Sequence, residues 1–167
     1  MKFAITAVAA TLSLIMAAGM TGSFFVFSTG VMPGLNGSRP ASAIDAMQAI
    51  NQRIQNPLFI GMFLLLPVFA AVAGILLMTM DEKTAGVLFL AAAAVYVLGA
   101  LVPSFAVNIP MNNALDGVHI PHDPAEAARI WAAYSARWTA WNTVRAVFSW
   151  VGLLAMGAGA YLWGGNG

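Results

Sequence analysis

The chain has 167 residues, of which 60% are hydrophobic and only 8% are charged. Soluble domains carry about 25% charged residues, so this composition excludes a soluble globule and indicates an integral membrane protein. A net charge of +1 without a basic run argues against a nucleic-acid partner, and the absence of cysteine excludes disulfides, thiolate metal sites and cysteine nucleophiles.

Four long apolar runs without a charged residue dominate the sequence. A helix needs about 20 residues to cross the hydrocarbon, and backbone in lipid must satisfy its own hydrogen bonds. We therefore predict an all-α protein, a single four-span domain folded as a four-helix bundle in the cell membrane, with both termini on the same side. The expected spans cover residues 3–31, 58–80, 84–107 and 146–163, and amphipathic helices are expected in the first and third loops at residues 42–55 and 124–145.

The first run follows Lys2 and resembles the core of a secretory signal peptide. It continues well beyond the length of such a core, so we expect it to remain in the protein as the first span. Small residues at positions 17–23 would let a neighbouring helix approach closely.

The first loop is expected to begin with a turn, because residues 31–37 are rich in Gly, Pro and Asn. Ser42 and Asp45 have the spacing of a capping box, which predicts the start of the first loop helix. Gln48 and Asn51 lie on one strip of that helix. The helix either lies at the membrane interface with a solvated polar face, or buries this strip, since amides suit partly buried hydrogen bonds.

Polar residues also gather where the third span ends and in the connection after it. Amides that face lipid are costly, so Asn108 and Asn112 should face the bundle or water. His119 and His122, separated by Pro121, have three interpretations: metal ligands, a general base near neutral pH, or solvated loop residues. A site built from two loop histidines would hold a metal weakly, so we expect no metal.

The last helix should start at Pro124, because Asp123 is a favourable capping residue and proline suits the first helical position. From Pro124 to Arg145 a straight helix would project about 30 Å before the fourth span begins. We expect it to break or to lie down on the membrane instead.

One face of this helix carries three aromatic rings, an amide and a guanidinium. At about 100° per residue they fall within roughly one quarter of the circumference. This aromatic stripe is either a belt at the headgroup level with a snorkelling arginine, or one wall of a pocket shared with Gln48, Asn51, Asn108 and Asn112. The stripe consists of Trp131, Tyr134, Trp138, Asn142 and Arg145.

The arginines suggest an orientation. The two lysines, Lys2 and Lys83, lie on the face opposite the first and third loops. The loop face carries five arginines against these two lysines, so the positive-inside rule predicts that the loop face is cytoplasmic. The arginines of that face are Arg39, Arg53, Arg129, Arg137 and Arg145.

Over nearly its whole length, the order of these motifs resembles the DUF1772 family, the anthrone oxygenase-like small membrane proteins. The resemblance implies a four-helix membrane fold. From the characterised fungal relatives, it also implies oxidation of an anthrone to an anthraquinone by molecular oxygen without an obvious cofactor. The residues that carry it are Phe24–Phe27 with Pro33, Gln48–Asn51, Asn56–Pro57, Asn108–Asn112, and Trp131, Trp138, Asn142 and Arg145.

These observations predict an oxygenase-like oxidoreductase that acts on, or binds, a hydroxyaromatic, anthrone or quinone-type molecule. His119 or His122 would be the base, Arg145 and Asn142 would stabilise the enolate, and O2 would be the co-substrate, with no cofactor. The alternative is a non-catalytic membrane subunit or a lipid- or quinone-binding module, and a homo-oligomer is also compatible with the sequence. The expected substrate-binding residues are Gln48, Asn51, Asn108, Asn112, Trp131, Tyr134 and Trp138.

Overall fold

The structure is a computed structural model that describes residues 1–165, and within that range it contains helices and no strand. Four helices are long and apolar enough to cross a membrane. The first joins α1 (Lys2–Val26), the π-helical segment η1 (Phe27–Val31) and α2 (Met32–Asn36). The second is α4 (Pro57–Met78). The predicted all-α membrane bundle is confirmed.

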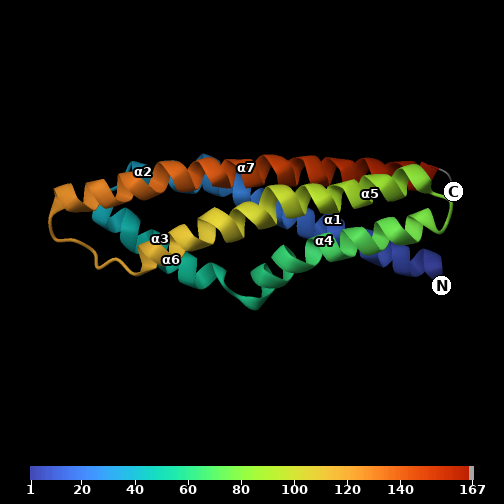
Figure 1. Ribbon diagram of the computed structural model, residues 1–167, viewed down its shortest axis with the longest axis horizontal. Coiled ribbons are helices and arrows are strands. Elements are labelled where there is room, and N and C mark those ends of the chain that lie inside the picture. Colours follow the sequence, from blue (N-terminus) through green and yellow to red (C-terminus); the bar gives the residue numbers. More distant parts are fainter. Residues whose placement is uncertain (166–167) are drawn as a thin grey trace.

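The third and fourth long helices run beside these two (Figure 1). The third is built from α5 (Lys83–Tyr96), the π-helical segments η2 (Val97–Leu101) and η3 (Ser104–Asn108), and α6 (Ile109–Asp116). The fourth is α7 (Pro124–Gly165), a single helix of 42 residues. The N-terminus and the end of α7 lie at the same end of the bundle.

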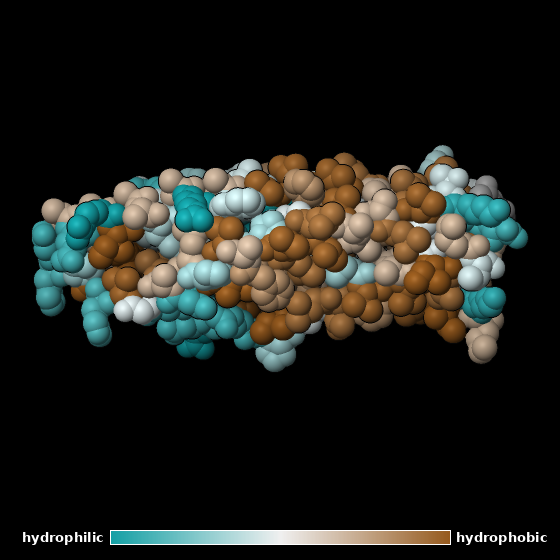
Figure 2. Space-filling model, viewed as in Figure 1, coloured by the Kyte–Doolittle hydropathy of each residue, from teal (hydrophilic) through white to brown (hydrophobic). Residues whose placement is uncertain are grey.

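The four long helices differ in length, and this divides the molecule into two parts. At about 1.5 Å per residue, the 22 residues of α4 span about 33 Å, close to the hydrocarbon thickness, whereas α7 spans about 63 Å. The first, third and fourth long helices extend past the level at which α4 begins. There they pack with α3 (Pro40–Ile54) into a second cluster, which we call the polar lobe. Figure 2 shows the apolar band over the bundle and the hydrophilic surface of the lobe.

The polar lobe has an apolar core of its own. This core explains why two predictions are wrong: a turn at residues 31–37, and a last helix that breaks or lies down before it enters the membrane. The first helix continues through Pro33 to Asn36, and α7 passes Arg145 without a break. Both extensions bury apolar side chains in the lobe, and this burial holds α7 upright. The core residues are Met32, Ala43, Ile44, Met47, Leu115, Ala127, Trp131, Tyr134 and Trp138.

The loop helix α3 begins two residues before its predicted start. Pro40 occupies the first turn, where its fixed φ suits a helix, and no side chain caps this end. Ile44 and Met47 are fully buried in the lobe, so α3 packs against protein and does not lie on the membrane.

The predicted start of α7 is confirmed. Asp123 Oδ1 accepts a hydrogen bond of 3.0 Å from the N–H of Ala125. This bond satisfies one of the free donors at the beginning of the helix.

The helices α4 and α5 approach each other closely at Gly74 and Gly86. A Cβ atom added to Gly74 would lie 2.9 Å from the carbonyl oxygen of Gly86 and 2.8 Å from Cγ of Leu90. A backbone oxygen cannot move away without separating the two helices. These glycines therefore set the distance between α4 and α5.

We expect Gly74→Ala to destabilise the protein by about 1–3 kcal/mol, because the added methyl group forces α4 and α5 apart. The matched control is Gly61→Ala, also within α4, where an added Cβ meets nothing within 4 Å. Thermal unfolding in detergent measures both. Equal midpoints for the two variants would contradict the close approach.

Candidate functional site

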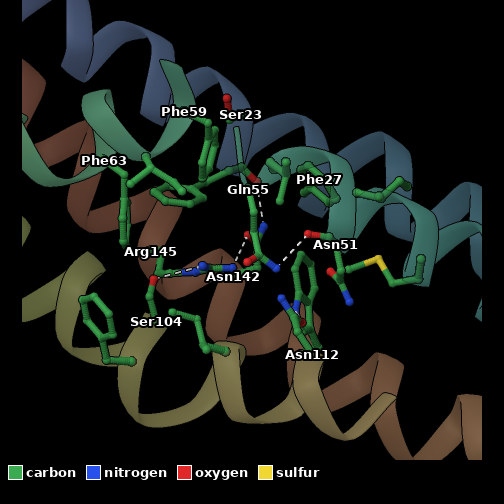
Figure 3. Close-up of a pocket in the computed structure, with 18 of the residues that line it drawn as sticks. Ser23, Phe27, Asn51, Gln55, Phe59, Phe63, Ser104, Asn112, Asn142 and Arg145 are labelled. Carbon is green, nitrogen blue, oxygen red and sulfur yellow. Dashed lines mark hydrogen bonds between the residues drawn. The ribbon is translucent and has the colours of Figure 1, made fainter. Parts of the chain in front are cut away.

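A cavity of about 280 Å³ lies where the bundle meets the polar lobe, with walls from all four long helices and α3 (Figure 3). Its lining is mostly apolar and aromatic, with polar groups from serine, amide and arginine side chains. The lining residues are Ser23, Phe24, Phe27, Met47, Ile50, Asn51, Ile54, Gln55, Phe59, Ile60, Phe63, Leu64, Ser104, Phe105, Ile109, Asn112, Asn113, Trp138, Asn142 and Arg145.

The helices place this cavity near one edge of the hydrocarbon layer. Arg145 lies about 30 Å from the end of α7 at Gly165, and Ser104 lies a similar distance from the start of α5, given a rise of about 1.5 Å per residue. The hydrocarbon is about 30 Å thick. Both polar residues therefore sit at the level where hydrocarbon gives way to headgroups.

The aromatic stripe of α7 faces the protein, as the pocket interpretation predicted, and all five of its residues are buried. Tyr134 stacks between Trp131 and Trp138, with ring centroids 5.7 and 6.2 Å away. Trp141 and Trp150 are the half-exposed tryptophans of this helix and are the better candidates for a membrane belt.

Arg145 is the most unusual group in the cavity wall. Its guanidinium donates to Ser104 Oγ at 3.0 Å and to Asn142 Oδ1 at 2.8 Å. It also lies over the rings of Phe24 and Trp138, with Cζ 4.7 and 5.5 Å from the centroids. A guanidinium has five N–H donors, so these two bonds leave three, and the buried Nε–H has no acceptor.

No carboxylate forms an ion pair with Arg145 in the part of the chain that the structure describes. The side chain is only 8% exposed. A buried charge without an opposite charge is costly unless a ligand compensates it. Arg145 therefore contributes a positive charge to the cavity wall that no carboxylate of the described residues compensates.

Asn142 positions this guanidinium. Its amide nitrogen donates to the carbonyl oxygen of Phe24 and to Ser28 Oγ, both at 2.7 Å, while its oxygen accepts from Arg145. Both kinds of polar group on Asn142 thus have protein partners. This residue, predicted as catalytic, ties α7 to the first long helix and orients Arg145.

Asn112 is oriented by two residues of the stripe. Its Oδ1 accepts from Tyr134 Oη at 2.9 Å and from Trp138 Nε1 at 2.7 Å. Because both donors need the oxygen, the amide nitrogen remains available as a donor, and Asn112 belongs to the cavity wall. Trp138 and Asn112 line the cavity, whereas Tyr134 lies outside the cavity wall and holds Asn112 through its hydrogen bond.

The other amides predicted for the site divide into two groups. Asn51 lines the cavity and donates to Asp116 Oδ1 at 3.2 Å. Gln48 instead donates to the carbonyl oxygens of Leu115 and Val118, at 2.8 and 2.9 Å, and does not line the cavity. It holds α3 to the end of the third long helix.

Asn108 and Trp131 are buried but do not line the cavity. Asn108 donates to the carbonyl oxygen of Trp138 at 3.2 Å, and its own side-chain oxygen has no partner. Trp131 Nε1 donates to Asn36 Oδ1 at 2.9 Å. Both residues hold elements of the site in place.

The two histidines lie apart from the cavity. His119 and His122 are exposed in the connection between α6 and α7, and neither lines the cavity wall. Within residues 1–165, no cluster of three or more His, Asp or Glu side chains forms a metal-binding group. The predicted role of a histidine as the base gains no support from this placement.

Sequence reasoning missed several lining residues. Ser104 precedes Asn108 by one helical turn, so a search for polar residues on the same face would have found it. Phe24, Phe59 and Phe63 carry no such pattern, because a phenylalanine in an apolar span is typical of lipid contact as well. The π-helical segments add to the difficulty, since each extra residue changes which side chains face the bundle.

We expect Tyr134→Phe to lower the free energy of unfolding by about 1 kcal/mol, because it removes the hydrogen bond to Asn112 without opening a cavity. The control is Tyr161→Phe, at a position that is 80% exposed. Thermal unfolding in detergent measures both changes. A loss no greater than that of the control would mean that the bond to Asn112 contributes nothing to stability.

A family model described as anthrone oxygenase matches residues 56–155. Comparisons with curated proteins and with solved structures gave no match. The matched range contains Ser104, Asn112 and Arg145, while Phe24 and Asn51 reach the cavity from outside it. Because the match covers more than half of the 167 residues, the chain belongs to the anthrone oxygenase (DUF1772) family of membrane proteins.

Proposed function

We propose that the cavity binds an anthrone-type hydroxyaromatic molecule as its enolate and promotes its oxidation by O2. The observation that carries this proposal is Arg145, a buried guanidinium with free donors and no carboxylate partner among the described residues. An enolate oxygen would supply the missing negative charge. Family membership supports the same substrate class.

The remaining lining suits a flat ring system. Phe24, Phe59, Phe63 and Trp138 contribute aromatic faces and edges to the walls. Ligand cavities in proteins usually hold about 300–1,000 Å³, so 280 Å³ suits a compact fused-ring molecule. The fixed amide nitrogen of Asn112 would donate to a second oxygen of the ligand.

Once the enolate has formed, it can react with O2 directly, so the main task of the protein is to stabilise the enolate. An anthrone loses a proton from its methylene carbon, and the resulting carbanion adds O2 to form a hydroperoxide after protonation. Loss of water then gives the anthraquinone, so one anthrone and one O2 yield one anthraquinone and one water. Arg145 stabilises the charge on the enolate oxygen, in surroundings where such stabilisation is stronger than in water.

The proton would leave to water at the headgroup end of the cavity mouth, beside the exposed side chains of Gln55 and Asn113. Among the lining residues, Arg145 is the sole titratable side chain, so no carboxylate or histidine of the wall accepts it. In this scheme Arg145 makes the bound anthrone more acidic, and water accepts the proton. In this scheme no side chain acts as the general base that the sequence analysis expected at His119 or His122. Stabilisation of the enolate oxygen by Arg145 takes its place.

We expect Arg145→Met to reduce anthrone-dependent O2 uptake by about 100-fold or more, because the variant keeps an unbranched apolar stem but loses the oxyanion donor. Arg145→Lys keeps the charge without the paired donors and should retain part of the activity. Purified protein in detergent is assayed with an oxygen electrode, after subtraction of uptake in buffer.

The matched control is Arg137→Met, two turns earlier on α7 and exposed, which should leave uptake unchanged. Thermal unfolding of each variant is measured alongside. Wild-type protein that takes up no O2 above the buffer rate would rule out the oxygenase. If it also binds no anthrone, and both Arg145 variants unfold at lower temperature, the residue serves to join the helices, as the non-catalytic alternative requires.

A further inference from the structure

The cavity has an opening on the side of the molecule that faces lipid. Four of its lining residues are exposed apolar side chains, and they lie on two neighbouring helices. Ile60 and Leu64 of α4 are 41% and 42% exposed, while Phe105 of η3 and Ile109 of α6 are 56% and 37% exposed. A wall residue that is also exposed marks the place where the cavity reaches the surface, so the mouth lies between these helices.

The fold explains why the helices separate there. α4 packs along α5 and against η2, whereas η3 and α6 pack against α7, and α6 also against α3. α4 begins at Pro57, directly after the turn that follows α3, while the third long helix continues to Asp116. In Figure 1 the beginning of α4 accordingly diverges from α6.

Towards the polar lobe the cavity wall includes buried residues of the lobe, while the exposed wall residues Gln55 and Asn113 carry the lateral mouth towards the headgroups. Met47 is fully buried, Asn51 is 2% exposed and Trp138 is 4% exposed, and all three belong to the cavity wall. A ligand that approached through the lobe would have to separate α3 from α7. The lateral mouth needs no such rearrangement.

The depth of the mouth matches the place where such ligands collect in a bilayer. Phe105 directly follows Ser104, at the boundary between hydrocarbon and headgroups, and Leu64 lies about 10 Å along α4 from its start, so the mouth extends from this boundary into the hydrocarbon. Rings that carry one polar group concentrate at this boundary, as the side chains of Trp and Tyr do. A hydroxyanthrone dissolved in the membrane therefore presents its edge at the level of the mouth.

We propose that the ligand enters the cavity sideways from the bilayer, between α4 and η3–α6, with Leu64 and Phe105 as the side chains that it must pass. This inference rests on the proposed function and adds the route and a restriction on the substrate. The substrate class is hydroxyaromatics dissolved in the membrane. Analogues that carry a permanent charge and stay in water do not reach Arg145.

The chain has no cysteine, so a pair of introduced thiols can be joined selectively. The test variant is Leu64→Cys with Phe105→Cys, bridged across the mouth by a short bismaleimide. The matched control is Leu65→Cys with Val102→Cys, on the same helices, 44% and 50% exposed and outside the cavity wall. A second test is Leu64→Trp against Leu65→Trp, which narrows the mouth without a cross-link.

Each protein is reconstituted in phosphatidylcholine vesicles and mixed with vesicles loaded with 1-hydroxyanthraquinone, a stable analogue of the product. Binding is followed by quenching of tryptophan fluorescence. Bridging the mouth or placing Trp at position 64 should slow association by about tenfold or more, while the controls keep the wild-type rate. Anthraquinone-2-sulfonate, supplied in water, should not bind.

Three results would overturn the inference. Equal association rates in the bridged, Leu64→Trp and control proteins would exclude the lateral route, and so would binding of the sulfonate at the rate of the membrane-dissolved probe. In both cases wild-type binding remains and the proposed ligand class stands. Absence of any binding of 1-hydroxyanthraquinone to wild-type protein would instead reject the proposed function together with the route.

Discussion

The hydrogen bonds of the Arg145 guanidinium join the helices at the point where the membrane bundle gives way to the polar lobe. Arg145 donates to Ser104 on the third long helix and to Asn142. The amide nitrogen of Asn142 in turn donates to the carbonyl oxygen of Phe24 on the first long helix. Hydrogen bonds to charged groups contribute about 1.5–3 kcal/mol each. They hold the cation in place, but they leave its charge uncompensated, and the proposed binding of an anionic oxygen rests on this property.

The position of this cation follows from a mismatch in helix length. α4 is only long enough to cross the hydrocarbon, whereas α7 is about twice as long and carries its aromatic stripe beyond the membrane. The lobe forms because the longer helices and α3 must bury apolar side chains that α4 cannot cover. The cavity lies at the step between the two parts, where α4 begins, and its exposed apolar wall residues open it to the lipid-facing side.

Patterns in the sequence predicted much of this arrangement. The spacing of Trp131, Tyr134, Trp138, Asn142 and Arg145 placed them on one face of α7, and all five are buried there. The predictions were less successful where the chain leaves the membrane. Of the turn-forming residues at 31–37, all but Gly37 lie within a helix, and the polar half of α7 stands upright. Local propensity is weak compared with tertiary packing, and the packing partners in each case come from distant parts of the chain.

The amino-acid sequence alone was sufficient for the class of protein, the four spans and the alignment of the stripe on one helix face, because hydrophobicity and helical period are local properties. The partners of each polar group depended on the tertiary structure. Asn142 and Asn112 are both amides at the site, yet one accepts a hydrogen bond from Arg145 and the other accepts hydrogen bonds from Tyr134 and Trp138. That difference arises from contacts between residues up to 118 positions apart, such as Asn142 with Phe24, and only the packing of the helices brings such residues together.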